Sequence, residues 1–199
     1  MTAEVSTSTL HAHDFRVDCT SRARLLDHDP AVLWFTGISG AGKSTIANEV
    51  ETRLHATRRL TYVLDGDSVR LGLCKDLGFT DTDRHENIRR VAEVARLMAD
   101  AGVVVLVCFI SPFRADREIA RTITGPHKFG EIHVYAPLEI AEARDPKGLY
   151  RLARRGVIQN FTGIDSPYEP PENPDVFINT ESASVESAAE AVLKWLASR

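Results

Sequence analysis

The sequence feature that most constrains the fold is a glycine-rich loop that directly follows an apolar run. The run covers residues 32–35, and the loop reads Gly37-Ile38-Ser39-Gly40-Ala41-Gly42-Lys43-Ser44, the pattern GxxxxGK[ST]. In such a loop between a strand and a helix, backbone N–H groups converge on phosphate oxygens, and the helix N-terminus adds a partial positive charge. The alternative is a tight glycine-rich turn that binds no phosphate, but such a turn would not need a lysine and a serine at the positions of Lys43 and Ser44. The sequence therefore predicts a nucleoside triphosphate site.

The chemistry of this loop gives each polar residue a role. We expect Lys43 to hold the β- and γ-phosphates of ATP, Ser44 to bind Mg²⁺ through its hydroxyl, and Thr45 to support the start of the helix. The predicted ATP-binding residues are Gly37, Ile38, Ser39, Gly40, Ala41, Gly42, Lys43, Ser44 and Thr45.

The remainder of the chain predicts a sheet of parallel strands. From Ala31 onward, short apolar runs alternate with longer segments of helical period, which is typical of βαβ units. Strands are expected at residues 32–36, 61–64, 103–109, 131–135 and 176–179, and helices at residues 43–56, 83–100, 115–124 and 184–198. The predicted fold class is α/β: a three-layer P-loop NTPase fold with a mostly parallel five-stranded sheet, helices on both faces and a lid segment.

Two segments fall outside this alternation. Residues 1–29 have no sustained periodicity, although residues 21–26 could form one helical turn, and we interpret them as an N-terminal arm before a domain of residues 30–199. Residues 145–173 combine prolines and glycines with Lys147 and several arginines. Long connections are usually functional or disordered, so we predict a mobile lid, with an inert surface excursion as the alternative.

Composition excludes several classes of function. The 24 basic and 28 acidic residues give a net charge of −4, so the chain has no general attraction for nucleic acid or an anionic membrane. Its apolar runs fall far short of the roughly 20 residues that span a bilayer, and residues 1–18 lack the apolar run of a signal peptide. Cys19, Cys74 and Cys108 are too few for a disulfide framework. We expect a cytoplasmic protein with reduced thiols, Cys108 being buried as a small apolar residue.

A pair of carboxylates narrows the reaction. The second expected strand ends in Leu64-Asp65-Gly66-Asp67, which places Asp65 and Asp67 at the carboxyl edge of the sheet beside the phosphate loop. One carboxylate can organise Mg²⁺ or take the proton of an acceptor hydroxyl, and the other can position the acceptor. A turn that only closes a strand is the alternative. Because the chain lacks the Asn-Lys-x-Asp motif that reads guanine, a kinase is favoured over a GTPase switch.

A basic cluster beyond these carboxylates indicates an anionic acceptor. Its members are Arg70, Lys75, Arg84, Arg89 and Arg90. Guanidinium groups bind phosphate or sulfate through paired hydrogen bonds, whereas Phe79 and Phe161 offer faces for a purine ring. The alternative for Arg89 and Arg90 is a solvated helix face.

Six further segments follow the glycine-rich loop in a fixed order. They are LDGDSVR at residues 64–70, DLGF at 76–79, RHENIRR at 84–90, FISPFR at 109–114, DPKGLY at 145–150 and NFTGIDSPYE at 160–169. Their joint occurrence is far more specific than the loop alone. From about residue 32 to residue 179, the chain resembles the adenylylsulfate kinase family of P-loop kinases.

This resemblance implies a transfer of the γ-phosphoryl of ATP, with Mg²⁺ as cofactor, to the 3′-hydroxyl of adenosine 5′-phosphosulfate in sulfate assimilation. It also implies a homodimer and functional coupling to ATP sulfurylase, with neither nucleic acid nor membrane as partner. The implied catalytic residues are Lys43, Asp65 and Ser111, with Ser44 and Asp65 as metal ligands. The implied substrate-binding residues are Asp67, Ser68, Val69, Arg70, Phe79, Arg84, His85, Glu86, Asn87, Ile110, Ser111, Lys147, Phe161 and Thr162.

The family assigns a phosphoserine intermediate to Ser111. As alternatives, Ser111 hydrogen-bonds a substrate while the phosphoryl passes directly in line, as in most P-loop kinases, or it caps the following helix. The chain departs from the family pattern at Ser68 and Cys74, where asparagine is usual. Cys74 thereby removes an amide that could bind the acceptor.

Two rival functions remain open. One is a kinase for another small acceptor, a nucleotide or a sugar. The other is an idle nucleotide-binding partner that regulates a sulfurylase, against which the intact Lys43, Ser44 and Asp65 argue.

Overall fold

Strands form at the apolar, β-branched segments that the sequence pattern indicates. The computed structural model describes residue 13 and residues 15–198. Its strands are β1 (Ala31–Thr36), β2 (Thr61–Asp65), β3 (Val104–Cys108), β4 (Lys128–Tyr135) and β5 (Val176–Asn179). They pair in parallel in the order β2-β3-β1-β4-β5. The structure confirms the α/β fold class and the five-stranded parallel sheet.

The central strands are covered on both faces. Every residue of β1 and β3 is buried, as expected of parallel strands that lie between two helical layers. On the edge strand β2, by contrast, Tyr62 is exposed. Strand β4 begins at Lys128, ahead of the predicted residue 131, and includes Gly130, where a Cβ would lie 2.5 Å from the Trp195 ring.

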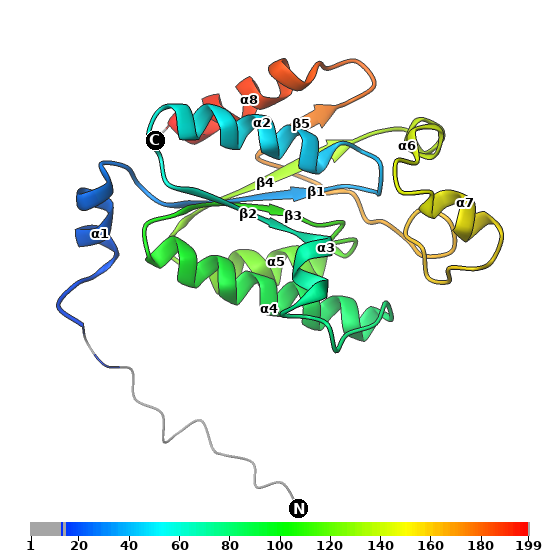
Figure 1. Cartoon of the computed structure of the whole chain (residues 1–199), viewed down its shortest axis with the longest axis horizontal. Coiled ribbons are helices and arrows are strands. Elements are labelled where there is room, and N and C mark those ends of the chain that lie inside the picture. The colour runs from blue at the N-terminus through cyan, green and yellow to red at the C-terminus, as the bar shows by residue number, and fades with distance from the viewer. Residues whose placement is uncertain (1–12, 14, 199) are drawn as a thin grey trace, which may run out of the picture.

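The long helices form one layer on each face of the sheet, as Figure 1 shows. One layer contains α2 (Lys43–Ala56) and α8 (Val185–Ala197), and the other contains α4 (Asp81–Asp100) and α5 (Arg114–Thr124). Alternate residues of β1 supply the two cores. Leu33 and Phe35 belong to the core under α2 and α8, and Val32 and Trp34 to the core under α4 and α5.

Three short helices that the sequence analysis did not predict lie at the carboxyl ends of the strands. They are α3 (Gly66–Leu71), α6 (Leu138–Arg144) and α7 (Leu149–Arg154), each with 6 or 7 residues. A helix of two turns or fewer shows too little of the 3.6-residue period to be recognised. Of these, α7 falls within the predicted lid (Figure 1).

The described part of the predicted arm contains the helix α1 (Cys19–Leu26). The Asp18 carboxylate caps it by accepting a hydrogen bond from the backbone N–H of Ser21 at 2.7 Å. Arg22 donates to the Asp100 carboxylate at 2.8 Å. Gly102 permits α1 to approach the chain after α4 closely, because a Cβ at this position would lie 2.5 Å from Leu26 Cδ1. Since β3 starts just after Gly102, α1 packs at the amino ends of the strands.

None of the helices in the described part of the chain combines the length and apolarity that crossing a membrane requires.

Candidate active site

The phosphate loop joins β1 to α2 in a conformation that depends on glycine. Gly37 has a φ of 151°, and a Cβ there would lie 2.1 Å from the carbonyl oxygen of Val134. Gly42, with a φ of 101°, is the residue that precedes the first turn of α2. Side chains are rarely tolerated in such conformations. The loop therefore has the strand-to-helix geometry that the sequence predicts.

A cavity of about 970 Å³ lies beside this loop at the carboxyl ends of the strands. The predicted lid and the first turns of α4 complete its walls. The predicted site residues that line it are Ser39, Gly40, Ala41, Gly42, Lys43, Ser44, Thr45, Asp65, Asp67, Arg70, Phe79, Arg84, Asn87, Ile110, Ser111, Lys147, Phe161 and Thr162. The fold thus gathers residues from seven separate segments of the sequence around one cavity.

The Lys43 ammonium is held by its own loop. It donates hydrogen bonds to the carbonyl oxygens of Gly37 and Ile38 at 2.8 and 2.9 Å. Burial lowers the pKa of Lys43 to about 8, and the charge of Lys147 acts in the same direction. A phosphate anion in the cavity would supply the negative charge that favours the protonated amine.

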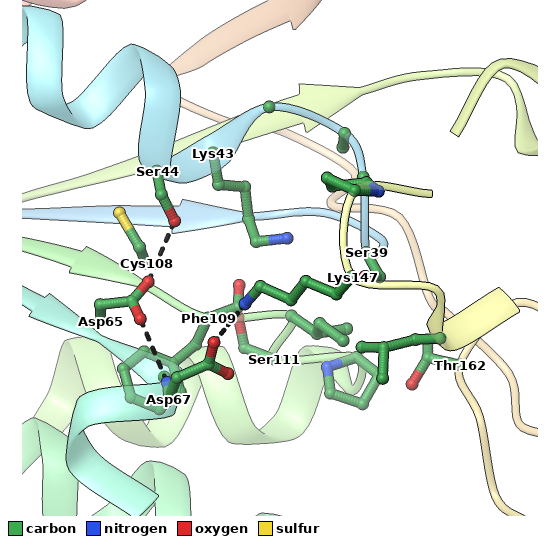
Figure 2. Close-up of a pocket in the computed structure, with 18 of the residues that line it drawn as sticks. Ser39, Lys43, Ser44, Asp65, Asp67, Cys108, Phe109, Ser111, Lys147 and Thr162 are labelled. Atoms are coloured by element: carbon green, nitrogen blue, oxygen red, sulfur yellow. Dashed lines mark hydrogen bonds and ion pairs between the residues drawn. The ribbon is translucent and has the colours of Figure 1, made fainter. Parts of the chain in front are cut away.

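Ser44 and Asp65 form an oxygen-rich pair at the edge of the loop (Figure 2). The Ser44 hydroxyl donates to the Asp65 carboxylate at 3.0 Å, and the other oxygen of Asp65 accepts the backbone N–H of Asp67 at 3.2 Å. Because Mg²⁺ prefers hydroxyl, carboxylate and water oxygens, this donor set fits the cation that the sequence predicts here.

A charged contact crosses the cavity from the lid to α3. Lys147 forms an ion pair with Asp67, which Figure 2 marks with a dashed line. Both side chains remain more than half exposed. The contact is therefore of the weak, solvent-screened kind, and a competing ligand charge can break it.

Two arginines and an aromatic ring form the far wall. Arg70 lies over the Phe79 ring, 4.4 Å from its centroid, and donates to the Gly78 carbonyl at 2.8 Å. Arg84 is buried and donates to the Asn160 carbonyl at 2.5 Å. Phe79 is exposed, whereas Phe161 is buried edge-on against Tyr150. The wall therefore offers one free aromatic face and two cations.

Ser111 is buried at the end of β3 in a strained conformation. Its φ is 39°, which is unusual for a residue with a side chain. The Trp34 indole N–H donates to its hydroxyl oxygen at 3.1 Å, and Arg117 donates to its carbonyl at 2.7 Å. The alternative that Ser111 caps the next helix is wrong, because Phe113 occupies the N-cap of α5.

Known proteins resemble this chain in sequence and in fold. A model of the family described as adenylylsulphate kinase matches residues 29–179. The chain belongs to the adenylylsulphate kinase family. The adenylyl-sulfate kinase of Aeromonas hydrophila is 55% identical over 94% of this chain and 93% of its own length. That of Vibrio parahaemolyticus is 53% identical over 100% of this chain and 98% of its own.

Longer proteins contain the same unit. The bifunctional enzyme CysN/CysC of Xylella fastidiosa is 56% identical over 95% of this chain, which spans only 30% of that protein. Among solved structures, the Mycobacterium tuberculosis adenylylsulphate kinase CysC in complex with AMPPNP and APS superposes with a TM-score of 0.83. It is 47% identical and the match covers 85% of this chain and 99% of that one.

Several predicted site residues lie outside the cavity lining. Gly37 and Ile38, the first two residues of the loop, contribute carbonyls to Lys43. Val69 is a core residue and Ser68 is exposed on α3. His85 hydrogen-bonds the buried Asp116 carboxylate at 2.6 Å.

Glu86 also lies outside the lining, because it pairs with arginines of its own helix. Arg89 and Arg90 both donate to Glu86, and these hydrogen bonds lower the pKa of Glu86 to about 2. Arg90 also binds Asp76 at 2.7 Å. The basic cluster is thus divided: Arg70 and Arg84 line the cavity, whereas Arg89 and Arg90 form the solvated helix face of the alternative interpretation.

Cys74, at which the chain departs from the family pattern, occupies a position in the core. Cys74 is fully buried in the core under α4 and is not among the residues that line the cavity, while Arg90 and Arg70 act on its thiol. An effect of this departure on acceptor binding stays a prediction. Cys108 is buried as predicted and also reaches the cavity lining. Burial raises its pKa to about 12, so this thiol is uncharged at neutral pH.

Sequence reasoning missed one wall of the cavity. Arg144 at the end of α6 donates to the hydroxyl and the carbonyl of Thr180 at 2.9 and 2.8 Å, beside the phosphate loop. Thr180 directly follows β5, so the rule that the carboxyl ends of parallel strands share one edge was a usable signal. Arg144 ends a helix too short to be predicted.

Proposed function

We propose that this chain transfers the γ-phosphoryl of MgATP to the 3′-hydroxyl of adenosine 5′-phosphosulfate, forming 3′-phosphoadenosine 5′-phosphosulfate. One continuous cavity supports this proposal, since it runs from the phosphate loop to the Arg70, Phe79 and Arg84 wall. The 47% identical CysC structure, a complex with AMPPNP and APS, supports the same pair of ligands.

The phosphate loop and Lys43 would bind the triphosphate. Ser44 and Asp65 would hold Mg²⁺, which when bound neutralises charge that develops on the transferring phosphoryl. Asp65 also lies where a carboxylate could take the proton of the acceptor hydroxyl. The desolvated Lys43 would place its positive charge against the β- and γ-phosphates, in a site where water screens it little.

The acceptor would occupy the wall opposite the loop. Arg70 and Arg84 supply charge for the phosphosulfate, and Phe79 supplies a ring face for the purine. Within the described residues, two buried lining atoms have no hydrogen-bond partner, Asn87 Oδ1 and Thr162 Oγ1. Buried polar atoms are normally satisfied, so these two support a polar ligand at that wall.

Direct in-line transfer fits the environment of Ser111 better than a phosphoserine relay. Ser111 is 2% exposed, and its hydroxyl oxygen already accepts the indole N–H of Trp34. A carboxylate close enough to raise the nucleophilicity of that hydroxyl would be expected for covalent catalysis. The groups that contact the Ser111 hydroxyl are instead the indole N–H of Trp34 and the carbonyl oxygen of Phe109.

We also propose that the protein acts as a homodimer and is coupled to an ATP sulfurylase. The bifunctional CysN/CysC relative supports the coupling. The alternative of a hexamer is raised by an APS kinase of Thiobacillus denitrificans that is 28% identical and is described as hexameric. Sedimentation velocity of the purified chain would distinguish a dimer from a monomer or a hexamer.

A panel of acceptors with radiolabelled ATP tests the reaction. Adenosine 5′-phosphosulfate should be the preferred acceptor, and AMP, adenosine and gluconate should be poor. Equal turnover of AMP would overturn the substrate assignment in favour of an adenylate kinase-like activity. Binding of ATP without turnover of any acceptor would instead favour the idle regulator.

A further inference from the structure

Three potential metal ligands meet at the end of the molecule opposite the cavity. They are Cys19 at the start of α1, Asp100 at the end of α4 and His127 in the turn before β4. One ligand atom from each, a thiol sulfur, a carboxylate oxygen and an imidazole nitrogen, lies within 4.8 Å of the other two. Segments far apart in the sequence thus bring three ligands to one point.

The surrounding contacts fix this arrangement. Arg22 binds one carboxylate oxygen of Asp100 at 2.8 Å and the Asp100 carbonyl at 3.0 Å. Gly102 lets α1 approach the end of α4 closely. Such outer contacts orient metal ligands in known sites. All three ligand residues are partly buried, so they are shielded from solvent yet open to an entering ion.

The kinds of ligand select the class of metal. Sulfur and imidazole nitrogen favour zinc-like ions, whereas Mg²⁺ and Ca²⁺ prefer oxygen alone. A tetrahedral zinc centre holds its sulfur and nitrogen ligands about 3.5 Å apart. Cys19 Sγ and His127 Nδ1 lie 4.0 Å apart, so a shift of a few tenths of an ångström would suffice.

The local charges are compatible with a divalent cation. Asp18, Asp29 and Asp100 act on the Cys19 thiol together with Arg22, and Asp100 and Arg96 act on His127. Acidic groups therefore outnumber basic ones around the three ligands.

We propose that Cys19, Asp100 and His127 bind one Zn²⁺ ion, with water as the fourth ligand. The ion would join α1 to the end of α4 and to the turn before β4, and the Cys19 proton would be released on binding. The proposal is independent of the proposed kinase activity, because no residue of this cluster lines the described cavity.

Cobalt titration of the metal-free full-length chain tests the site. Co²⁺ should bind with a stoichiometry of one, giving a sulfur-to-cobalt charge-transfer band and the intense visible bands of tetrahedral coordination, and Zn²⁺ should remove both. C19S should abolish the charge-transfer band, and H127A should weaken Co²⁺ binding at least 10-fold. H55A, which removes an exposed histidine on α2, is the matched control and should bind Co²⁺ like the native chain.

Thermal unfolding provides a second readout. Zn²⁺ should raise the Tm of the native chain and of H55A but leave the Tm of folded H127A unchanged. If C19S is too unstable to study, H127A and D100N carry the test. A charge-transfer band that persists without Cys19, or a native chain that binds no stoichiometric Co²⁺, would overturn the proposal and leave only a thiol–imidazole hydrogen bond.

Discussion

Ser111 combines backbone strain with a dense set of hydrogen bonds. A non-glycine residue at a φ of 39° is held there by its surroundings. Trp34 fixes its hydroxyl and Arg117 its carbonyl, and Arg117 also donates to the Glu169 carbonyl at 2.8 Å. One buried guanidinium thus connects the end of β3 to the end of the predicted lid.

Replacing Asp65 should affect the chemical step more than replacing Ser111. D65N should reduce kcat by about 100-fold or more, the usual scale for loss of a general base. S111A should retain measurable turnover, since losing a hydrogen bond costs about 1–2 kcal/mol. Single-turnover kinetics would compare the two, after ATP binding shows that both are folded.

The stereochemistry of phosphoryl transfer distinguishes direct in-line transfer from a route through a phosphoserine. With a chiral γ-phosphoryl group, inversion is the expected result of one direct transfer. Retention would indicate two transfers and a phosphoserine at Ser111, contradicting the direct route.

The conservative variant R117K should show that Arg117 acts by positioning the backbone of Ser111 and Glu169. Lysine can keep an ion pair with Glu131, which Arg117 binds at 2.6 Å, but it cannot also reach the Ser111 and Glu169 carbonyls. We expect kcat to fall about 10-fold with little change in the KM for ATP. R121K, on the same helix and paired with Asp175, is the control. Equal effects of R117K and R121K on kcat would show a general loss of charge instead.

Among the elements, β4 shows what sequence patterns can predict about secondary structure and what they cannot. Periodicity located all five strands and the four long helices, because each has enough residues to show a repeat. It missed the start of β4, where Gly130 makes room for Trp195, and the helices of two turns or fewer. Local patterns do not show that a glycine faces a distant side chain.

The candidate site likewise contains some residues that could be placed from sequence and others that could not. The phosphate loop, Asp65 and Asp67 could be placed from sequence, because the chain order and the parallel topology bring them to one edge. Arg144 could not, since its position depends on how α6 packs. Likewise, only the packing of α4 shows that Cys74 faces the core and that Arg89 pairs with Glu86.

His133 on β4 should make the free energy of unfolding depend on pH. It is buried beside Tyr168, Tyr135 and Phe177, and burial lowers its pKa to about 4, with the charge of Arg117 adding to the effect. The unfolded chain takes up this proton near pH 6.5, so stability should fall as pH drops from 6.5 towards 4, by up to about 3 kcal/mol.

Urea unfolding of H133Q at pH 7 and pH 4.5 would measure this effect. The variant should lose less stability between these two pH values than the native chain. H55Q, which changes an exposed histidine, should lose as much as the native chain. The same loss in H133Q and the native chain would assign the pH dependence to other groups.

At the scale of the whole molecule, residues 145–173 join the sheet and its helical layers through both buried and exposed contacts. Tyr150 and Phe161 are buried in the core, and Tyr168 shares a hydrogen bond of 3.0 Å with Thr36, whereas the Lys147–Asp67 pair is exposed. Exposed pairs of this kind exchange readily with ligand charges.

Hydrogen exchange across residues 145–173 should therefore slow when ADP and adenosine 5′-phosphosulfate are both bound. The two nucleotides would replace the Lys147–Asp67 contact with stronger anionic partners. Exchange measured by mass spectrometry with each nucleotide alone provides the comparison. Unchanged exchange in the ternary complex would show a static excursion and would remove Lys147 from the substrate site.

The parallel sheet gives the molecule two dissimilar poles. The cavity lies where the strands end, whereas α1 is anchored where the strands begin, through Arg22 and the close fit at Gly102. A protein fused ahead of α1 is consequently tethered on the side away from the cavity mouth. Tags, partner domains or surface attachments placed there would leave the cavity mouth open, whereas the same cargo fixed to α7 would lie beside the cavity, since Leu149 of α7 lines it.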